Sequence, residues 1–244
     1  MNHTICLGQK SGQIPAGYGF SELLGRDTYY ETPVHIFQGM TEGPVVMAEA
    51  GIHGDEVAGI LALDGLLPRL YILSGKLIVL PRMNRPACVK KVRFLNQDLN
   101  LVFPGRKDAR PYEQALAREI YDYVGRHKVQ YLVTLHEALS KYNEKTGHGL
   151  GQTVVYGVKP APAYLDNWLS TLNTRAMSPS EIFHAVYYPV KGSSTETMAK
   201  AYNLSGGFCV ETWRGFSLEE RIRMQTEVIL SFLETVGLRY RLER

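Results

Sequence analysis

Four side chains in this 244-residue sequence have types and positions that could support metal-dependent chemistry: His53, Glu56, His136 and Glu211. His53 and Glu56 lie three residues apart in GIHGDE, whereas His136 lies in TLHE and Glu211 in FCVETW. Two histidines and a carboxylate form the ligand set of an open catalytic zinc site, which keeps a fourth position for water. Zinc lowers the pKa of such a water from about 15.7 to roughly 7. We therefore interpret His53, Glu56 and His136 as the ligands of one zinc ion per chain.

The fourth side chain, Glu211, is interpreted as the general base, because activation of water also needs a carboxylate that accepts and returns a proton. Each of these features has an ordinary explanation when it stands alone. A His-x-x-Glu pair is common on helix surfaces, a histidine at a strand end is commonly structural, and Glu211 could form a helix cap or an ion pair. Their combination, next to glycines that let the backbone approach a site, favours the catalytic interpretation.

Apolar periodicity predicts the elements that must bring these residues together. Compact apolar runs typical of buried strands occupy residues 43–51, 76–81, 129–138, 153–157 and 208–212. Helical spacing begins at Asp55, with Pro68 near the end of that helix, and recurs at 110–127, 161–173 and 217–237. The alternation predicts an α/β fold with a mostly parallel mixed sheet and helices on both faces. Such folds bind ligands at the carboxyl ends of their strands, where the four side chains are expected.

Composition and charge exclude several other classes of protein. Hydrophobic residues make up 45% and charged residues 21% of the chain, which is typical of a globular protein rather than a disordered one. The net charge of +3 is small and the basic residues are scattered, so nucleic-acid binding is not expected. No apolar run approaches the roughly 20 residues that a membrane-spanning helix needs. Residues 1–15 also lack the basic start and apolar stretch of a signal peptide.

The three cysteines indicate a reducing environment. Cys6, Cys88 and Cys209 are far apart and show no CxxC spacing, so we expect reduced thiols and a cytoplasmic location. No repeat, low-complexity tract or Gly/Ser linker marks a boundary, so residues 1–244 are predicted to form a single zinc-hydrolase domain. Nothing in the sequence indicates an oligomeric state.

The order of these motifs resembles that of the zinc carboxypeptidase superfamily, close to its succinylglutamate desuccinylase/aspartoacylase branch. The resemblance covers GIHGDE, RFLNQDLNLVFPG, TLHE and FCVETW, and YGFSELLGR extends it upstream. It implies a three-layer α/β fold, one catalytic zinc and hydrolysis of an amide bond. It also implies the same ligands, His53, Glu56 and His136, and the same base, Glu211.

Within RFLNQDLNLVFPG, the resemblance implies two further roles: stabilisation of the oxyanion by Arg93 and binding of a substrate carboxylate by Asn100. A guanidinium aimed at developing negative charge lowers the barrier in a water-poor cleft. The next residue departs from the family, since Leu101 stands where an arginine commonly pairs with a substrate carboxylate. Leucine neither carries charge nor donates a hydrogen bond, so substrate specificity is expected to have changed at this substrate-binding position.

Three functional hypotheses are compatible with the resemblance. The first is a carboxypeptidase-type hydrolase that trims a small peptide, cell-wall peptides included, and the segment YGFSELLGR favours it. The second is an N-acyl amino acid deacylase of the aspartoacylase/succinylglutamate desuccinylase type, favoured by the short spacing between Glu56 and His136. The third is a binding domain without catalytic activity, which only Leu101 favours. Three residues are candidates for a substrate-contacting tyrosine: Tyr187, Tyr188 and Tyr202.

Overall fold

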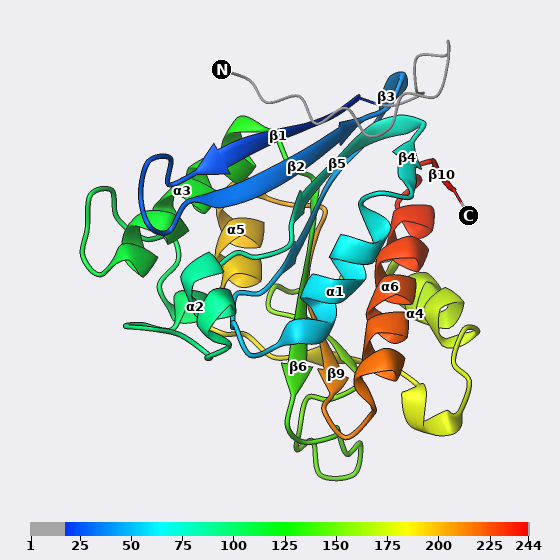
Figure 1. Cartoon of the computed structure of the whole chain (residues 1–244). Helices are drawn as coiled ribbons and strands as arrows, with labels where there is room; N and C mark the ends of the chain where they lie inside the picture. The colour runs from blue at the N-terminus through cyan, green and yellow to red at the C-terminus, as the bar shows by residue number, and fades with distance from the viewer. Residues whose placement is uncertain (1–17, 244) are drawn as a thin grey trace.

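The main feature of the structure is an eight-stranded sheet with the strand order β1-β2-β5-β3-β6-β9-β7-β8 (Figure 1). This computed structural model describes residues 18–243, so Cys6 and the residues 1–15 considered above lie outside the described range. The strands are β1 (Tyr18–Leu24), β2 (Thr32–Gln38), β3 (Thr41–Ala50), β5 (Ser74–Leu80), β6 (Tyr131–Ala138), β7 (Thr153–Tyr156), β8 (His184–Tyr187) and β9 (Gly206–Trp213). A separate two-stranded sheet pairs β4 (Leu70–Ile72) with β10 (Tyr240–Leu242).

The middle of the large sheet is parallel, whereas antiparallel pairs occur towards its edges. β3 pairs in parallel with both β5 and β6, and β6 pairs in parallel with β9. β1 and β2 form an antiparallel hairpin beside β5, and β7 runs antiparallel to β9. This mostly parallel mixed sheet confirms the predicted fold class.

Helices cover both faces of the sheet and complete three layers (Figure 1). One face is covered by α1 (Val57–Leu66), α4 (Leu165–Asn173) and α6 (Leu218–Thr235). The opposite face is covered by α3 (Tyr112–Arg126) and α5 (Ser194–Tyr202). The remaining helical segments are α2 (Arg85–Lys90), η1 (Leu99–Leu101) and η2 (Pro179–Glu181).

The central strand β3 shows why a continuous apolar run predicts burial on both faces. Val46 and Ala48 pack into the core under α1 and α6, whereas Met47 packs into the core under α3. Side chains alternate between the faces of a strand, so a strand that is apolar at successive positions needs cover on both sides. Each fully buried aliphatic side chain then contributes about 1.5–3 kcal/mol.

Apolar periodicity does not reveal every element. The sequence of α5, STETMAKAY, is mostly polar or small, but the hydroxyl of Ser193 accepts a hydrogen bond from the backbone N–H of Glu196 (3.3 Å) and caps the helix. This Ser-x-x-Glu spacing is the signal that could have identified it. The predicted start of α1 is also corrected: the helix begins at Val57, and Asp55 accepts a hydrogen bond from Arg214 (2.8 Å).

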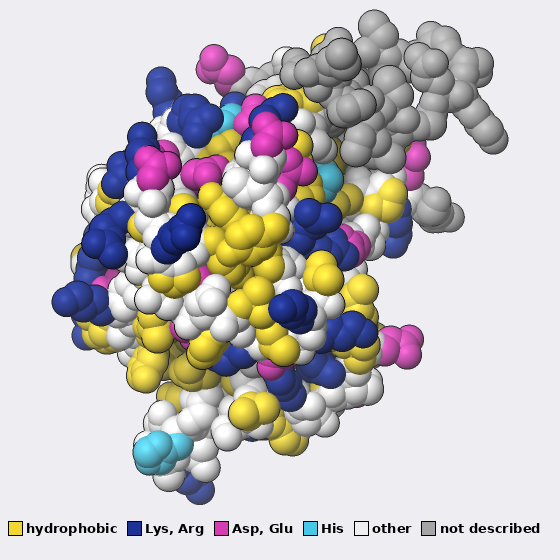
Figure 2. All heavy atoms as spheres, turned by 60° about the vertical axis from the view of Figure 1, so that its left-hand side comes forward, with side chains coloured by type: hydrophobic (Ala, Val, Ile, Leu, Met, Phe, Trp, Pro, Cys, Tyr) yellow, Lys and Arg dark blue, Asp and Glu magenta, His cyan; other side chains and the backbone are white. Residues whose placement is uncertain are grey.

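The surface seen in Figure 2 has no dominant basic patch. Lys and Arg side chains are spread among acidic and hydrophobic ones over this face of the molecule. This distribution agrees with the small net charge of the sequence. Among residues 18–243, no helix combines the length and the apolar character that crossing a bilayer requires.

Candidate active site

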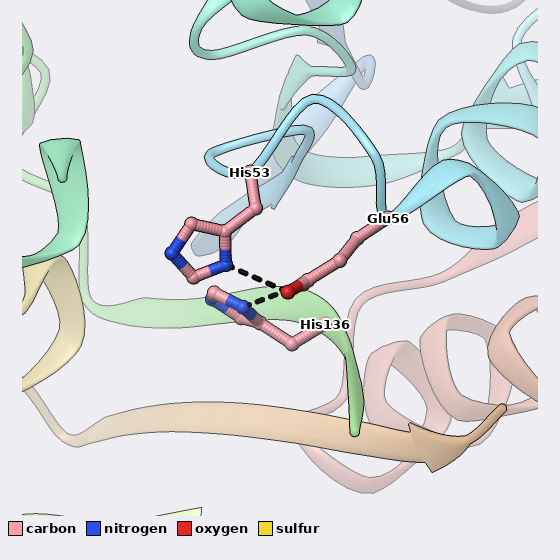
Figure 3. A group of neighbouring side chains, drawn as sticks. All are labelled: His53, Glu56 and His136. Atoms are coloured by element: carbon pink, nitrogen blue, oxygen red, sulfur yellow. Dashed lines mark hydrogen bonds and ion pairs between the residues drawn. The ribbon is translucent and has the colours of Figure 1, made fainter. Parts of the chain in front are cut away.

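His53, Glu56 and His136 converge at the carboxyl ends of two neighbouring parallel strands (Figure 3). His53 and Glu56 lie in the loop between β3 and α1, and His136 lies near the end of β6. Nδ1 of His53 is 2.7 Å from Oε1 of Glu56, and Nδ1 of His136 is 2.9 Å from Oε2 of the same carboxylate. All three residues are buried, and their potential ligand atoms lie within 4.8 Å of one another. This arrangement brings the predicted ligand set together around one point.

The electrostatics of the cluster favour a cation between the two rings. Burial disfavours a charged imidazole, but hydrogen bonds with Asp98 and Glu56 outweigh it and raise the pKa of His53 to about 9. Burial also disfavours a charged carboxylate, but His136 and His53 hold the pKa of Glu56 far below its usual range. Imidazole nitrogens and a carboxylate are the donors that zinc takes in open catalytic sites, so these residues fit this metal. A metal ion that binds here must displace the proton of His53.

Glycines let the loop of His53 and Glu56 pack closely against its neighbours. Gly51 begins the loop at a φ of 66°, which glycine adopts without strain. A Cβ atom on Gly54 would lie 2.1 Å from the carbonyl carbon of Ala87 in α2. The backbone N–H of Gly54 also donates a hydrogen bond to the carbonyl of Arg93 (3.3 Å). The loop is therefore held between α2 and the segment that begins at Arg93.

Asp98 is a residue of the site to which the sequence motifs assign no role. Its Oδ1 lies 3.0 Å from Nε2 of His53, whereas the other ring nitrogen faces Glu56. The same oxygen accepts a hydrogen bond from the backbone N–H of Asn100 (2.9 Å), which fixes the start of η1. Metal-binding histidines commonly donate their second N–H to a carboxylate, which sets the tautomer and the ring orientation. The position of Asp98 inside RFLNQDLNLVFPG is the signal that could have identified it.

We expect Asp98→Asn to weaken zinc binding about 10- to 100-fold, because the negative charge that supports the N–H of His53 is removed. The dissociation constant can be measured by competition with a chromophoric chelator. Asp122→Asn is the matched control, since the carboxylate of Asp122 pairs with Arg118 on the surface of α3 (2.8 Å). Equal zinc affinity in the Asp98 variant and in this control would contradict the role of Asp98.

Arg93 lies at the edge of the cluster, with a half-exposed side chain. Its Nη1 donates a hydrogen bond to Oε1 of Glu56 (3.2 Å), and its Nη2 is 3.5 Å from Oδ2 of Asp98. A guanidinium this close to the carboxylate of Glu56 could stabilise negative charge on a substrate bound at the cluster. The role of Arg93 in oxyanion stabilisation stays a prediction.

Glu211 approaches the cluster from β9, where it is the register partner of His136 on β6. Potential ligand atoms of His136, Cys209 and Glu211 lie within 4.8 Å of one another. Burial is the main cause that raises the pKa of Glu211, opposed by the nearby His136. A carboxyl group with a raised pKa beside a metal site is suited to accept and return a proton. The role of Glu211 as the general base stays a prediction.

Asn100 and Glu211 line the same cavity, which has a volume of about 60 Å³. Oδ1 of Asn100 accepts a hydrogen bond from the backbone N–H of Ser194 in the first turn of α5 (3.2 Å). Its side-chain NH₂ group remains as a donor for a ligand, which suits the predicted binding of a carboxylate. Tyr188 also lines the cavity, whereas Tyr187 and Tyr202 do not. Tyr188 is therefore the candidate tyrosine that is best placed to contact a substrate.

Leu101 lies at the surface, although it directly follows Asn100. Leu101 is 55% exposed, and it is not part of the cavity wall. Its carbonyl packs against Gly192, where a Cβ atom would lie 2.4 Å from the carbonyl oxygen of Leu101. The role of Leu101 in substrate binding therefore stays a prediction. It rests on the absence of the charge and the hydrogen-bond donors that an arginine would have at this position.

A buried acid, Glu49, lies on β3 beside the strand that carries His136. Its Oε2 accepts a hydrogen bond from the hydroxyl of Thr134 (2.9 Å), and the hydroxyl of Ser194 lies 3.5 Å from that of Thr134. Its Oε1 has no hydrogen-bond partner among the described residues. Burial raises the pKa of Glu49 to about 8, against the effect of both hydroxyls. The folded protein therefore keeps Glu49 protonated at neutral pH.

We expect Glu49 to make the folded state less stable as the pH rises from about 4.5 to 8. In this window the carboxyl group of Glu49 keeps its proton in the folded protein but has lost it in the unfolded chain. The free energy of unfolding therefore falls by about 3–5 kcal/mol in total as the pH rises. In Glu49→Gln this contribution is absent. Urea unfolding with chelator present measures the free energy of unfolding of the native protein and of Glu49→Gln at several pH values. The contributions of the other titrating groups cancel in the difference between the two proteins. A difference that is constant across the window would contradict this assignment.

A mostly parallel sheet between two helix layers, with a His–Glu–His cluster at the carboxyl ends of its central strands, makes this a three-layer α/β protein with a candidate metal site. The chain belongs to the succinylglutamate desuccinylase/aspartoacylase family. The family model described as "Succinylglutamate desuccinylase/Aspartoacylase catalytic domain" matches residues 42–204. The match includes both histidines of the cluster and ends before Glu211.

The share of each relative that is similar to this chain differs from one relative to the next. The N-alpha-acetyl-L-2,4-diaminobutyric acid deacetylase of Halomonas elongata is 39% identical over 90 residues, which are 35% of this chain and 25% of that protein. The mDAP-bound form of Helicobacter pylori Csd4, a D,L-carboxypeptidase, has a TM-score of 0.75 at 21% identity, covering 82% of this chain and 52% of that chain. For the succinylglutamate desuccinylase/aspartoacylase from Rhodobacter sphaeroides, the TM-score is 0.64 at 22% identity, covering 93% and 66%. The similarity therefore spans only part of each relative, and the two structures support the fold.

Proposed function

We propose that this protein is a zinc-dependent hydrolase that cleaves the amide bond of an N-acyl amino acid. The observation that carries the proposal is the buried cluster of His53, Glu56 and His136 with Glu211 beside it. Family membership supports hydrolysis of an amide bond. The similarity to a deacetylase of an acetylated amino acid supports an N-acyl amino acid as the substrate.

Each predicted residue has a distinct task in this proposal. A zinc ion held by the cluster would supply a water nucleophile at neutral pH. Glu211 accepts a proton from the attacking water and returns it to the leaving nitrogen. Arg93 stabilises the negative charge that develops on the carbonyl oxygen, and Asn100 donates hydrogen bonds to the carboxylate of the substrate. Leu101 leaves that carboxylate without a neighbouring arginine, so we propose that the substrate differs from those of relatives that have one.

A second candidate function is the hydrolysis of small peptides, which the segment YGFSELLGR favours. This segment forms β1 and the start of the turn that follows it. Both candidate functions use the same fold and the same predicted site, and they differ in the bond that is cleaved.

One assay separates these functions. Zinc-loaded protein is incubated with a mixed panel of N-acyl amino acids, short peptides and muropeptides, and the products are identified by mass spectrometry. We expect a free carboxylic acid and a free amino acid to be released from the N-acyl amino acids, and a chelator to stop the release. Cleavage of peptides alone would support the carboxypeptidase hypothesis. A zinc-loaded protein that releases no product from the panel would favour a binding domain without catalytic activity.

We also propose a reducing, cytoplasmic compartment and a single zinc-hydrolase domain for residues 1–244. Cys88 and Cys209 are free thiols, which supports the reducing compartment. The ligand cluster and Glu211 come from neighbouring strands of one sheet, which supports the single domain.

A further inference from the structure

The cavity next to Glu211 is lined by two carboxylates and by no basic side chain. Its polar wall is formed by Asn100, Tyr188, Ser193, Thr195, Glu196 and Glu211. No lysine, arginine or histidine is among its lining residues, all of which lie in the described part of the chain. In a partly enclosed space, where the effective dielectric is lower than in bulk water, two acidic groups attract a positive ligand group and repel a third carboxylate.

Glu196 has no task in the proposed hydrolysis, although it is buried in this wall. Its residue is only 8% exposed. Oε1 pairs with the exposed Lys200 one turn further along α5, whereas Oε2 has no hydrogen-bond partner among the described residues. A buried carboxylate oxygen without a donor raises the free energy of the site until a donor is supplied. Oε2 is therefore the atom that remains to accept a hydrogen bond from a ligand.

Oε2 of Glu196 lies close to Gly157, which is part of the cavity wall. Gly157 lines the cavity, and a Cβ atom added to it would lie 3.2 Å from Oε2 of Glu196. A bound water needs only about 10–15 Å³, so the cavity of about 60 Å³ has room for a larger polar group. Asn100 and Glu196 both line this cavity, so a single ligand bound in it can contact both side chains.

We propose that Glu196 binds a primary ammonium group on the substrate's side chain, so that the protein prefers N-acyl diamino acids. This inference rests on the proposed function, which places the substrate carboxylate at Asn100 and the scissile bond near Glu211. A side-chain ammonium that enters the cavity donates a charge-assisted hydrogen bond to Oε2 of Glu196. A neutral side chain cannot form this hydrogen bond, and an acidic one meets two carboxylates.

The test compares substrates that differ only in this amine. Nα-acetyl derivatives of 2,4-diaminobutyrate and ornithine are paired with those of norvaline and norleucine, their neutral isosteres. For the native protein, we expect kcat/KM to be about tenfold or more higher with the better amine than with its isostere, because a hydrogen bond to a charged group contributes about 1.5–3 kcal/mol. In Glu196→Gln, we expect this ratio to fall to near one.

Lys200→Met is the matched control, because it also changes one charge at the same ion pair but leaves the carboxylate of Glu196 in place. We expect it to retain the preference for the amine. Thermal unfolding and zinc content establish that each variant is folded and loaded. A native protein that shows no preference for either amine, or a preference that survives in Glu196→Gln, would overturn the inference.

A binding measurement separates this inference from the proposed function. Calorimetry with zinc-loaded Glu211→Gln compares the affinity for Nα-acetylornithine with that for Nα-acetylnorleucine, with and without Glu196→Gln. Tighter binding of the amine that depends on Glu196 supports the inference even if no acetylated amino acid is hydrolysed. Equal binding of both ligands overturns it, and hydrolysis of the neutral substrates would then still support the proposed function.

Discussion

Glu211→Gln is expected to lower kcat by about 10²- to 10⁴-fold, because the variant cannot accept a proton from the attacking water. The zinc content is expected to stay at one ion per chain, since Glu211 approaches the cluster from β9 and lies outside the set of His53, Glu56 and His136. The raised pKa of Glu211 has burial as its main cause, and the amide of glutamine is a neutral isostere in the same space. Steady-state kinetics together with metal analysis of the same preparation measure both effects.

Glu211→Asp distinguishes proton transfer from packing at this position. Aspartate keeps a carboxylate on a shorter side chain, so we expect it to retain part of the activity that glutamine loses. Similar loss in both variants, accompanied by loss of zinc, would mean that Glu211 holds the metal instead. Unchanged turnover in Glu211→Gln would remove this residue from the role of base.

His53→Ala is expected to reduce the zinc content from one ion per chain to almost none and to abolish hydrolysis with it. The variant removes one of three ligands, and it also removes the ring that lies 2.7 Å from Oε1 of Glu56 and 3.0 Å from Oδ1 of Asp98. The carboxylate of Glu56 is buried, so the loss of a partner also destabilises the fold, by about 1–3 kcal/mol. Metal analysis after dialysis and urea unfolding measure the two effects separately.

His184→Ala is the matched control for this prediction. His184 also pairs with a carboxylate, Glu144, at 3.0 Å, but it lies outside the cluster. We expect this control to bind zinc like the native protein. A His53 variant that retains its zinc would contradict the assignment of the ligand set.

The convergence of His53, Glu56 and His136 could be predicted from the sequence, because GIHGDE follows one apolar run and His136 lies near the end of another. Parallel strands end at the same edge of a sheet, so GIHGDE after β3 and TLHE at the end of β6 were expected to meet there. The structure brings His53, Glu56 and His136 together in this way. The alternation of strands and helices likewise predicted the sheet and both of its helix layers.

The partners of these residues could not be predicted in the same way. Asp98 contacts His53 across 45 positions of the chain, and Glu49 contacts Thr134 across 85. Such contacts depend on the register between segments, which apolar periodicity does not define. Apolar periodicity did not predict the polar helix α5, because this helix contributes few residues to the core. Its first turn nevertheless holds Asn100 and carries Glu196.

The contact between Asn100 and the first turn of α5 has a consequence for engineering. The predicted ligands lie in the loop between β3 and α1 and near the end of β6, whereas Asn100, Tyr188 and Glu196 are supplied by a short helical turn, a loop and α5. If the proposed roles hold, Asp98 and Asn100 link the metal site to the substrate site, whereas residues 188 and 196 lie in other parts of the chain than the proposed ligands. Libraries that vary residue 188 and residue 196 while keeping Asn100 and Ser194 should yield enzymes with new substrate ranges that still load their metal.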